Sequence, residues 1–182
     1  MSTADRLLEA AGRLFYEEGI TAVGVDRICK QAKVSKRSLY QLFPTKDALV
    51  AASLERTGGF LMPRLVPDGG DSPRARIRHS FEALERSAAA PGYEGCPFVG
   101  AAVEIKDGEH PAKQVVRRLK LAFAEALETE LRSAGAADPA GLAEQLAIVW
   151  DGCATRSMIT GAPLNGRAVA MAEALLDHAG VE

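Results

Sequence analysis

The sequence predicts an all-α fold of about nine helices, with a small N-terminal domain at residues 1–45 and a larger domain at residues 46–182. Apolar residues recur at intervals of three and four along most of the chain, which is the period of an amphipathic helix. No stretch alternates apolar and polar residues as a half-buried strand does. The breaks between the periodic stretches contain proline or glycine. With 47% apolar and 25% charged residues, the chain has an ordinary globular composition.

The first two helices are indicated by apolar spacing and by the residues at their ends. Residues 3–18 carry one apolar face, with Ser2 or Thr3 as the cap and Gly19 as the end. A second helix of about two turns follows Gly24, which is suited to its N-cap position. The inward residues are Leu7, Leu8, Ala11, Leu14 and Phe15 in the first helix, and Val25, Ile28, Cys29 and Ala32 in the second.

A third, shorter helix is predicted to begin after Ser35, whose hydroxyl can cap it, and to end before Pro44. Its expected inward residues are Leu39, Leu42 and Phe43. Thr45 can cap a fourth helix over residues 46–61. Lys33 lies in the turn before the third helix, where a left-handed backbone would cost roughly 1 kcal/mol.

Five further helices are expected in the rest of the chain. They cover residues 73–89, 97–106, 111–132, 139–160 and 165–179. The last two carry faces of small and apolar residues that we expect to pair across the two-fold axis of a homodimer. These faces consist of Ala143, Ala147, Gly152 and Ala154, and of Val169, Ala172, Leu175, Leu176 and Ala179.

Several classes of protein are disfavoured by composition and spacing. The N-terminus lacks the basic start and apolar run of a signal peptide, and no run approaches the ~18 apolar residues of a membrane span, so a cytoplasmic protein is expected. Cys29, Cys96 and Cys153 lack the pairing of a disulfide framework or a zinc site. Since phosphate loops, nucleophile elbows and metal-ligand spacings are also missing, we expect no enzyme activity, metal or cofactor.

Basic residues are concentrated in one short segment, although the net charge of the chain is −2. Residues 1–56 hold nine basic and seven acidic side chains, whereas residues 27–46 hold six basic ones and no acidic one. Such a run is most often only a solvated face. A polyanion partner therefore needs support from geometry.

That support comes from the second and third helices, which with their short turn have the form of a helix-turn-helix motif. The outward residues of the third helix are Lys36, Arg37, Tyr40 and Gln41. Arg37 can donate two hydrogen bonds to a guanine edge, Gln41 can pair with adenine, and Tyr40 can reach a phosphate or pack internally. Lys46 can bind a phosphate beside the free N–H groups of the fourth helix.

The stretch "VSKRSLYQLFPTKDAL", residues 34–49, resembles the DNA-binding segment of the tetracycline-repressor (TetR) family of bacterial transcriptional regulators, and the likeness covers residues 3–56. It implies a homodimeric repressor of operator DNA whose C-terminal helices bind a small-molecule effector. It assigns DNA contacts to Val25, Asp26, Arg27, Ser35, Lys36, Arg37, Ser38, Tyr40, Gln41 and Lys46. Lys33 replaces the usual turn glycine of the family, and Gln41-Leu42 replaces its usual aromatic or histidine pair.

An effector pocket is expected among the fifth to eighth helices, where apolar residues converge with a few polar groups. Its candidate residues are Phe81, Leu84, Tyr93, Phe98, Val103, Phe123, Trp150 and Met158, with His79 or Arg156 as a polar anchor. "GCPFVGAAVEI", residues 95–105, resembles the sixth-helix segment of one branch of the family.

Three alternatives remain open from the sequence. Cys96, at a helix N-terminus, could sense oxidants or electrophiles, or could simply be a small buried apolar residue. An all-α scaffold can hide an active site. An architectural DNA-binding protein without an effector would have a filled C-terminal core.

Overall fold

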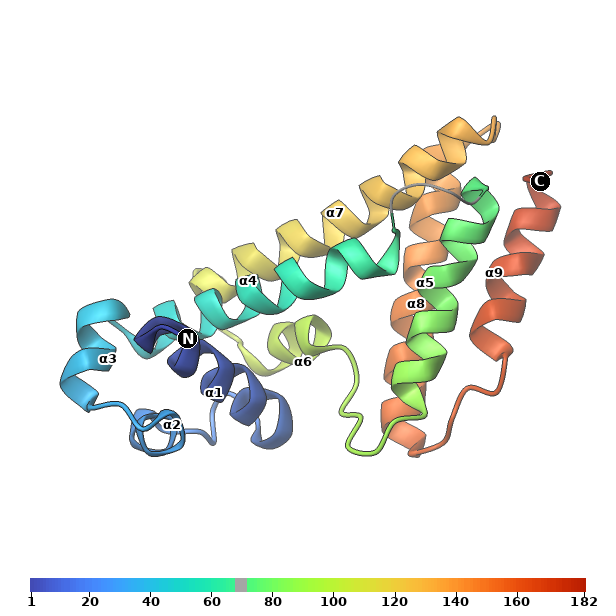
Figure 1. Cartoon of the computed structure of the whole chain (residues 1–182). Coiled ribbons are helices and arrows are strands. Elements are labelled where there is room, and N and C mark those ends of the chain that lie inside the picture. Colours follow the sequence, from blue (N-terminus) through green and yellow to red (C-terminus); the bar gives the residue numbers. More distant parts are fainter. Residues whose placement is uncertain (68–71) are drawn as a thin grey trace. The chain divides into compact units, whose positions relative to one another are not determined.

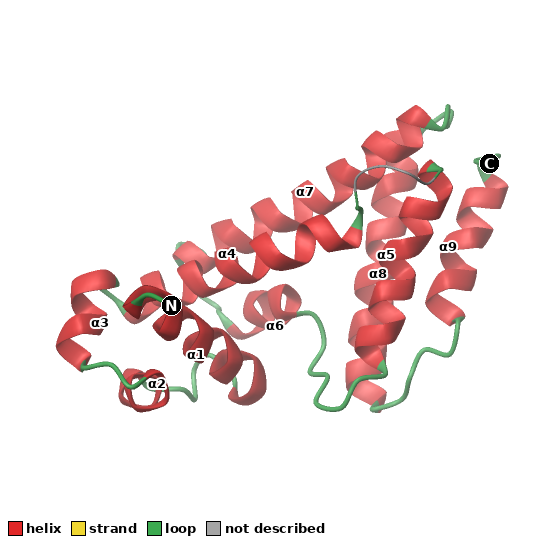
Figure 2. Cartoon of the chain, in the orientation of Figure 1, coloured by secondary structure: helices red, strands yellow, loops and turns green. Residues whose placement is uncertain are grey.

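A computed structural model of the chain describes residues 1–67 and 72–182, in which nine helices and no strand occur (Figure 2). The predicted all-α fold is confirmed. The helices are α1 (Thr3–Glu18), α2 (Val25–Ala32), α3 (Lys36–Leu42), α4 (Lys46–Leu65), α5 (Pro73–Ala88), α6 (Pro97–Glu104), α7 (Pro111–Ser133), α8 (Pro139–Thr160) and α9 (Arg167–His178), labelled in Figure 1.

The chain forms two compact units, each made of two separate segments. The first unit combines residues 1–60 with residues 97–118, and the second combines residues 61–96 with residues 119–182. α6 therefore belongs to the same unit as α1, α2 and α3. The predicted domain boundary between residues 45 and 46 stays a prediction.

The N-terminal helices begin where side chains satisfy their first backbone N–H groups. Ser2 forms a capping box with Asp5 at the start of α1, and the Ser35 hydroxyl accepts from the Ser38 N–H at 3.1 Å. The Thr45 hydroxyl accepts from the Ala48 N–H at 3.0 Å at the start of α4. The Ser35 and Thr45 caps lie directly before α3 and α4 and mark where each of these helices begins.

The core of α1, α2 and α3 is apolar and closely matches the predicted faces. Its fully buried residues include Leu7, Ala11, Val23, Ile28, Leu39 and Leu49. The prediction that Leu42 faces inward was wrong, because this side chain is 46% exposed. Leu39 and Phe43, one helical turn apart, contact the core, and a helix this short has only one narrow inward side.

α4 extends past its predicted end and continues through Pro63 to Leu65. Proline removes one backbone hydrogen bond and its ring crowds the preceding turn. The helix nevertheless continues for two residues beyond Pro63, an extension that a sequence pattern alone does not indicate.

Lys33 ends α2 with φ 54° and ψ 48°, so the turn takes the left-handed conformation that the sequence left open. A lysine side chain is strained there, whereas glycine is not. Lys33→Gly is expected to raise the free energy of unfolding by about 1 kcal/mol, measured by urea denaturation. Lys30→Gly, within the right-handed part of α2, should lower it by about 1 kcal/mol. A destabilised Lys33→Gly variant would contradict this account of the turn.

In the second unit, α5, α8 and α9 lie side by side (Figure 1). The N-cap residue of α9 is Gly166, which has no side chain to cap the helix. The Glu85 carboxylate of α5 takes that role by accepting hydrogen bonds from the N–H groups of Gly166, Ala168 and Val169, at 2.7, 2.9 and 3.2 Å. The carboxylate thus fastens α9 to α5.

Four of the small or apolar residues expected to pair two subunits instead face the interior of their own unit. Ala143, Ala154, Ala172 and Leu176 are almost completely buried. α5 supplies the other side of this packing, because it contacts both α8 and α9. The spacing of apolar residues correctly identified a buried face. It could not show whether that face packs within one chain or between two chains, because both kinds of face have the same spacing.

Candidate nucleic-acid interface

α2 and α3 are separated by only three residues, and their geometry is that of a helix-turn-helix motif. Leu39 is fully buried and anchors α3. Lys36, Arg37, Tyr40 and Gln41 are exposed, as expected from the sequence. In the part of the chain that the structure describes, Arg37 forms no ion pair. α3 therefore offers a guanidinium, a phenol and an amide to a partner.

Two of the predicted DNA contacts are cations held by carboxylates of their own unit. Arg27 donates to Glu18 at 2.5 Å, and Lys36 donates to Asp26 at about 3.0 Å. The hydrogen bond that Arg27 donates to Glu18 raises the pKa of Arg27, and the one that Lys36 donates to Asp26 raises the pKa of Lys36. Because exposed ion pairs contribute little, a phosphate can replace either carboxylate. Asp26 accepts a hydrogen bond from Lys36, and its own role as a DNA contact stays a prediction.

Ser35, Ser38 and Val25 are the remaining predicted contacts of the motif. The Ser35 and Ser38 hydroxyls lie 2.9 Å apart and are bonded to each other. Val25 is partly buried against the core. The serine pair therefore shapes the start of α3, and its role in DNA binding stays a prediction.

Lys46 is half-buried and contacts the loop between α1 and α2. Its Nζ donates to the Ile20 carbonyl oxygen at 2.5 Å and lies 6.0 Å from the centre of the Phe15 ring. An ammonium group has three N–H donors, so two remain for a phosphate. The sequence indicated the phosphate role, but this hydrogen bond to the loop was not predicted.

Glu104, at the end of α6, holds the same loop from the other side. Its Oε2 accepts from the Ile20 N–H at 2.9 Å and its Oε1 accepts from the Thr21 N–H at 2.6 Å. Gly19 has φ 88°, in the left-handed region that favours glycine, and a Cβ there would lie 3.4 Å from Glu104 Oε1. The loop before α2 is thereby fixed by a distant carboxylate.

The pKa of Glu104 reflects two opposing influences. Desolvation is the largest single influence and raises the pKa. The hydrogen bonds from the Thr21 and Ile20 N–H groups, with the charge of Lys46, together outweigh it, so the pKa of Glu104 lies below its ordinary value. Sequence reasoning assigned no role to Glu104. The one available signal was the glutamate within the segment at residues 95–105 that resembles a branch of the family.

The residues predicted to form an effector pocket do not all lie together. Phe81, Leu84, Phe123 and Trp150 are buried in the core of the second unit, where the Trp150 Nε1–H donates to the Ser80 carbonyl at 3.2 Å. Phe98 and Val103 belong to the first unit. Their place in a pocket stays a prediction.

The remaining candidates lie near the surface of the second unit. Tyr93 lines a depression of about 440 Å³ beside the end of α8. His79 lines a different depression, of about 470 Å³, between the end of α4 and α5. Arg156 and Met158 are exposed on α8. The two depressions have different linings, and the role of these residues in effector binding stays a prediction.

The three cysteines are buried, and none forms a disulfide. Burial raises the pKa of the Cys29 and Cys153 thiols, which lowers their reactivity because the thiolate is the reactive form. Cys96 is only 7% exposed, and a sensor thiol has to be reachable.

In the described ranges, no cluster of three or more His, Cys, Asp or Glu side chains is placed to hold a metal ion, and no helix has the length and apolarity that crossing a membrane requires.

Comparison with known proteins gives concordant results. Residues 7–53 match the family model described as bacterial regulatory proteins, tetR family. The crystal structure of a TetR-type transcriptional regulator from Streptomyces avermitilis covers the whole of both chains with 41% identity and a TM-score of 0.92. The transcriptional regulator AcuR of Cereibacter sphaeroides is 31% identical over 165 residues, which make up 84% of this chain and 75% of AcuR.

A further relative is matched over only part of its length. The regulator YuxN of Bacillus subtilis is 28% identical over 114 residues, which make up 62% of this chain but only 37% of YuxN. The full-length similarity to the Streptomyces structure and to AcuR does not depend on this match. This chain therefore belongs to the TetR family of transcriptional regulators, and its N-terminal helices form the DNA-binding helix-turn-helix domain of that family.

Proposed function

We propose that this protein is a repressor that binds operator DNA as a homodimer and is released when a small molecule binds its second unit. The observation that carries the proposal is the exposure of Arg37, Tyr40 and Gln41 on a helix whose opposite side is anchored by the buried Leu39. A helix presented in this way can enter the major groove, which is ~12 Å wide. Its N-terminal side chains then lie at the base edges.

The exposed Arg37 and Gln41 side chains each have a matching partner on a DNA base. The Arg37 guanidinium is suited to the O6 and N7 atoms of guanine, and the Gln41 amide to N6 and N7 of adenine. Arg27 and Lys36 exchange their carboxylates for phosphates, and Lys46 uses its remaining donors. The arrangement thus combines two base contacts with three phosphate contacts in each half-site.

The outward face of α8 and α9 supports the homodimer. Ile148 and Ile159 of α8 are 62% and 70% exposed, and Met171 of α9 is 50% exposed. Ile148 and Ile159 are eleven residues apart, which is close to three full turns, so they lie on one side of α8. A second copy of this face would cover them, and two recognition helices about 34–36 Å apart would then match successive major grooves.

Effector binding is proposed for the second unit, with the depressions lined by Tyr93 and His79 as the starting sites. Release follows if the bound ligand favours an arrangement in which the two recognition helices no longer match the groove spacing. A ligand that binds both arrangements equally would have no effect.

Selection of DNA by the purified protein from a random pool tests the proposal. We expect enrichment of a two-fold symmetric sequence. Arg37→Ala should relax the preference at one base pair per half-site, because a bidentate contact supplies about 1–3 kcal/mol of discrimination. Arg117→Ala, which removes an exposed cation of α7, should select the same sequence as the wild type. Recovery of unrelated sequences by the wild type would refute the proposal.

A further inference from the structure

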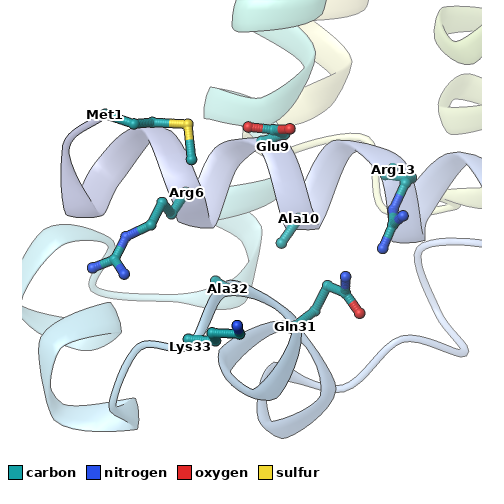
Figure 3. A pocket seen from close by; sticks show the side chains of 8 residues that line it. All are labelled: Met1, Arg6, Glu9, Ala10, Arg13, Gln31, Ala32 and Lys33. Atoms are coloured by element: carbon teal, nitrogen blue, oxygen red, sulfur yellow. The ribbon is translucent and has the colours of Figure 1, made fainter.

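A depression of about 290 Å³ lies between α1 and the end of α2, outside the surface that α3 presents. Three of its eight lining residues are basic, one is acidic, and the others are uncharged. The lining consists of Met1, Arg6, Glu9, Ala10 and Arg13 of the N-terminal segment, and of Gln31, Ala32 and Lys33. Figure 3 shows the Arg13 and Gln31 side chains pointing toward each other across the gap between the two helices.

The basic residues of this depression lack the partners that other cations of the unit have. Arg27, Lys36 and Arg56 each form an ion pair with a carboxylate. In the described part of the chain, Arg13 and Lys33 form none. Positive charge is thus left uncompensated on a surface that is not the recognition helix.

Arg6 is unusual within this group. Its Nη2 donates weakly to the Thr3 hydroxyl at 3.5 Å. Its Nε is buried and has no hydrogen-bond acceptor among the described residues. Burying a charged donor without an acceptor is unfavourable. An anion held in the depression would not reach this enclosed atom, but it would stabilise the charge of the Arg6 guanidinium by electrostatic attraction.

The position of the depression identifies the anion. Lys33 ends α2, and Ser35 caps the start of α3 only two residues later. In helix-turn-helix proteins the first helix of the motif crosses the sugar-phosphate backbone while the second enters the groove. The edge of the depression formed by α2 and the turn is therefore next to the backbone when α3 is docked.

We propose that this depression binds a backbone phosphate that flanks the bases contacted by α3, with Arg13 and Lys33 as its ligands. The proposal rests on the DNA-binding function proposed above. Arginine is suited to the task because its planar group can donate two parallel hydrogen bonds to phosphate oxygens. The negative charge of Glu9 repels the phosphate and so weakens this contact.

Two substitutions that should change the DNA affinity in opposite directions test the proposal. The affinity of the full-length protein for its selected duplex is measured between 50 and 200 mM salt. Arg13→Gln should weaken binding about fivefold and lower the slope of log affinity against log salt by about 0.9, the value for one lost phosphate contact. Glu9→Gln should strengthen binding about threefold, because it removes a repelling charge. Both side chains are exposed, so neither change threatens folding.

Matched controls separate a local contact from a general effect of charge. Arg117→Gln and Glu109→Gln make the same changes at exposed positions of the same unit outside the depression, and should leave the salt slope unchanged. In a second arm, methylphosphonate groups replace the flanking phosphates. The wild type should bind this duplex more weakly than the unmodified one. Arg13→Gln, which already lacks the contact, should show no further loss of affinity when the phosphates are replaced.

Equal salt slopes for Arg13→Gln and the wild type, or shifts of the same sign for Arg13→Gln and Glu9→Gln, would overturn the proposal. In that case the wild type would still prefer its selected duplex, so the proposed function would stand. A wild type that binds all duplexes alike would refute the function and the phosphate site together.

Discussion

Ile148→Asp is expected to leave the purified protein monomeric and to lower its affinity for the operator by about a thousandfold. Ile148 is 62% exposed at the outward face of α8. In a two-fold symmetric interface the substitution places a carboxylate in both copies, and burying an unpaired charge is strongly unfavourable. A monomer reaches one half-site only, and the loss of bivalent binding costs a factor of about 10²–10⁴.

Sedimentation velocity and operator titration measure the two effects. Leu121→Asp is the matched control, because Leu121 is 53% exposed but lies on α7 rather than on α8 or α9. This control should remain dimeric and bind DNA as the wild type does. Circular dichroism checks that both variants are folded. A dimeric Ile148→Asp protein would show that subunits meet through another surface.

Glu104→Ala is expected to lower the free energy of unfolding of the first unit by about 2–3 kcal/mol. The substitution leaves the Ile20 and Thr21 N–H groups without their carboxylate acceptor, and hydrogen bonds to charged groups contribute more than neutral ones. The loop that precedes α2 would be released together with the carbonyl that positions Lys46. DNA affinity should therefore fall about tenfold, because part of the binding energy must then order the loop.

The pH dependence of stability gives an independent check on Glu104. Because the pKa of Glu104 is lower in the folded protein than in the unfolded chain, its contribution is fully present above the unfolded value and is lost as the pH falls through the folded value. The stability difference between wild type and Glu104→Gln should be largest near pH 7 and should shrink as the carboxylate protonates. Glu109→Gln, at an exposed loop position, should show no such trend. A constant difference down to pH 3 would contradict the assignment.

The sequence predicts features of this fold that depend on neighbouring residues. The caps at Ser35 and Thr45 and the start of α5 at Pro73 are confirmed. Each follows from a few adjacent residues, since a cap hydroxyl and its N–H are three positions apart. Helix boundaries marked by proline were likewise close to those observed, with α8 at Pro139–Thr160 as the best case.

Features that depend on distant residues could not be predicted. Glu104 meets its hydrogen-bond donors across 83 and 84 positions of sequence, and no local pattern indicates that pairing. For the same reason the hydrogen bond from Lys46 to Ile20 was missed, and the buried face of α8 was assigned to a second subunit instead of to α5 and α9. Apolar periodicity shows that a face is buried, but it does not show which partner covers it.

The exposed side of α3 is the basis of the whole account, and a specificity ratio tests it most directly. This ratio is the affinity for the selected duplex divided by the affinity for a scrambled duplex at physiological salt. The wild type is predicted to give at least about 10³, and a variant with both Arg37→Ala and Gln41→Ala is predicted to approach one while retaining non-specific binding. A double variant that keeps the ratio of the wild type would show that these side chains do not recognise DNA bases.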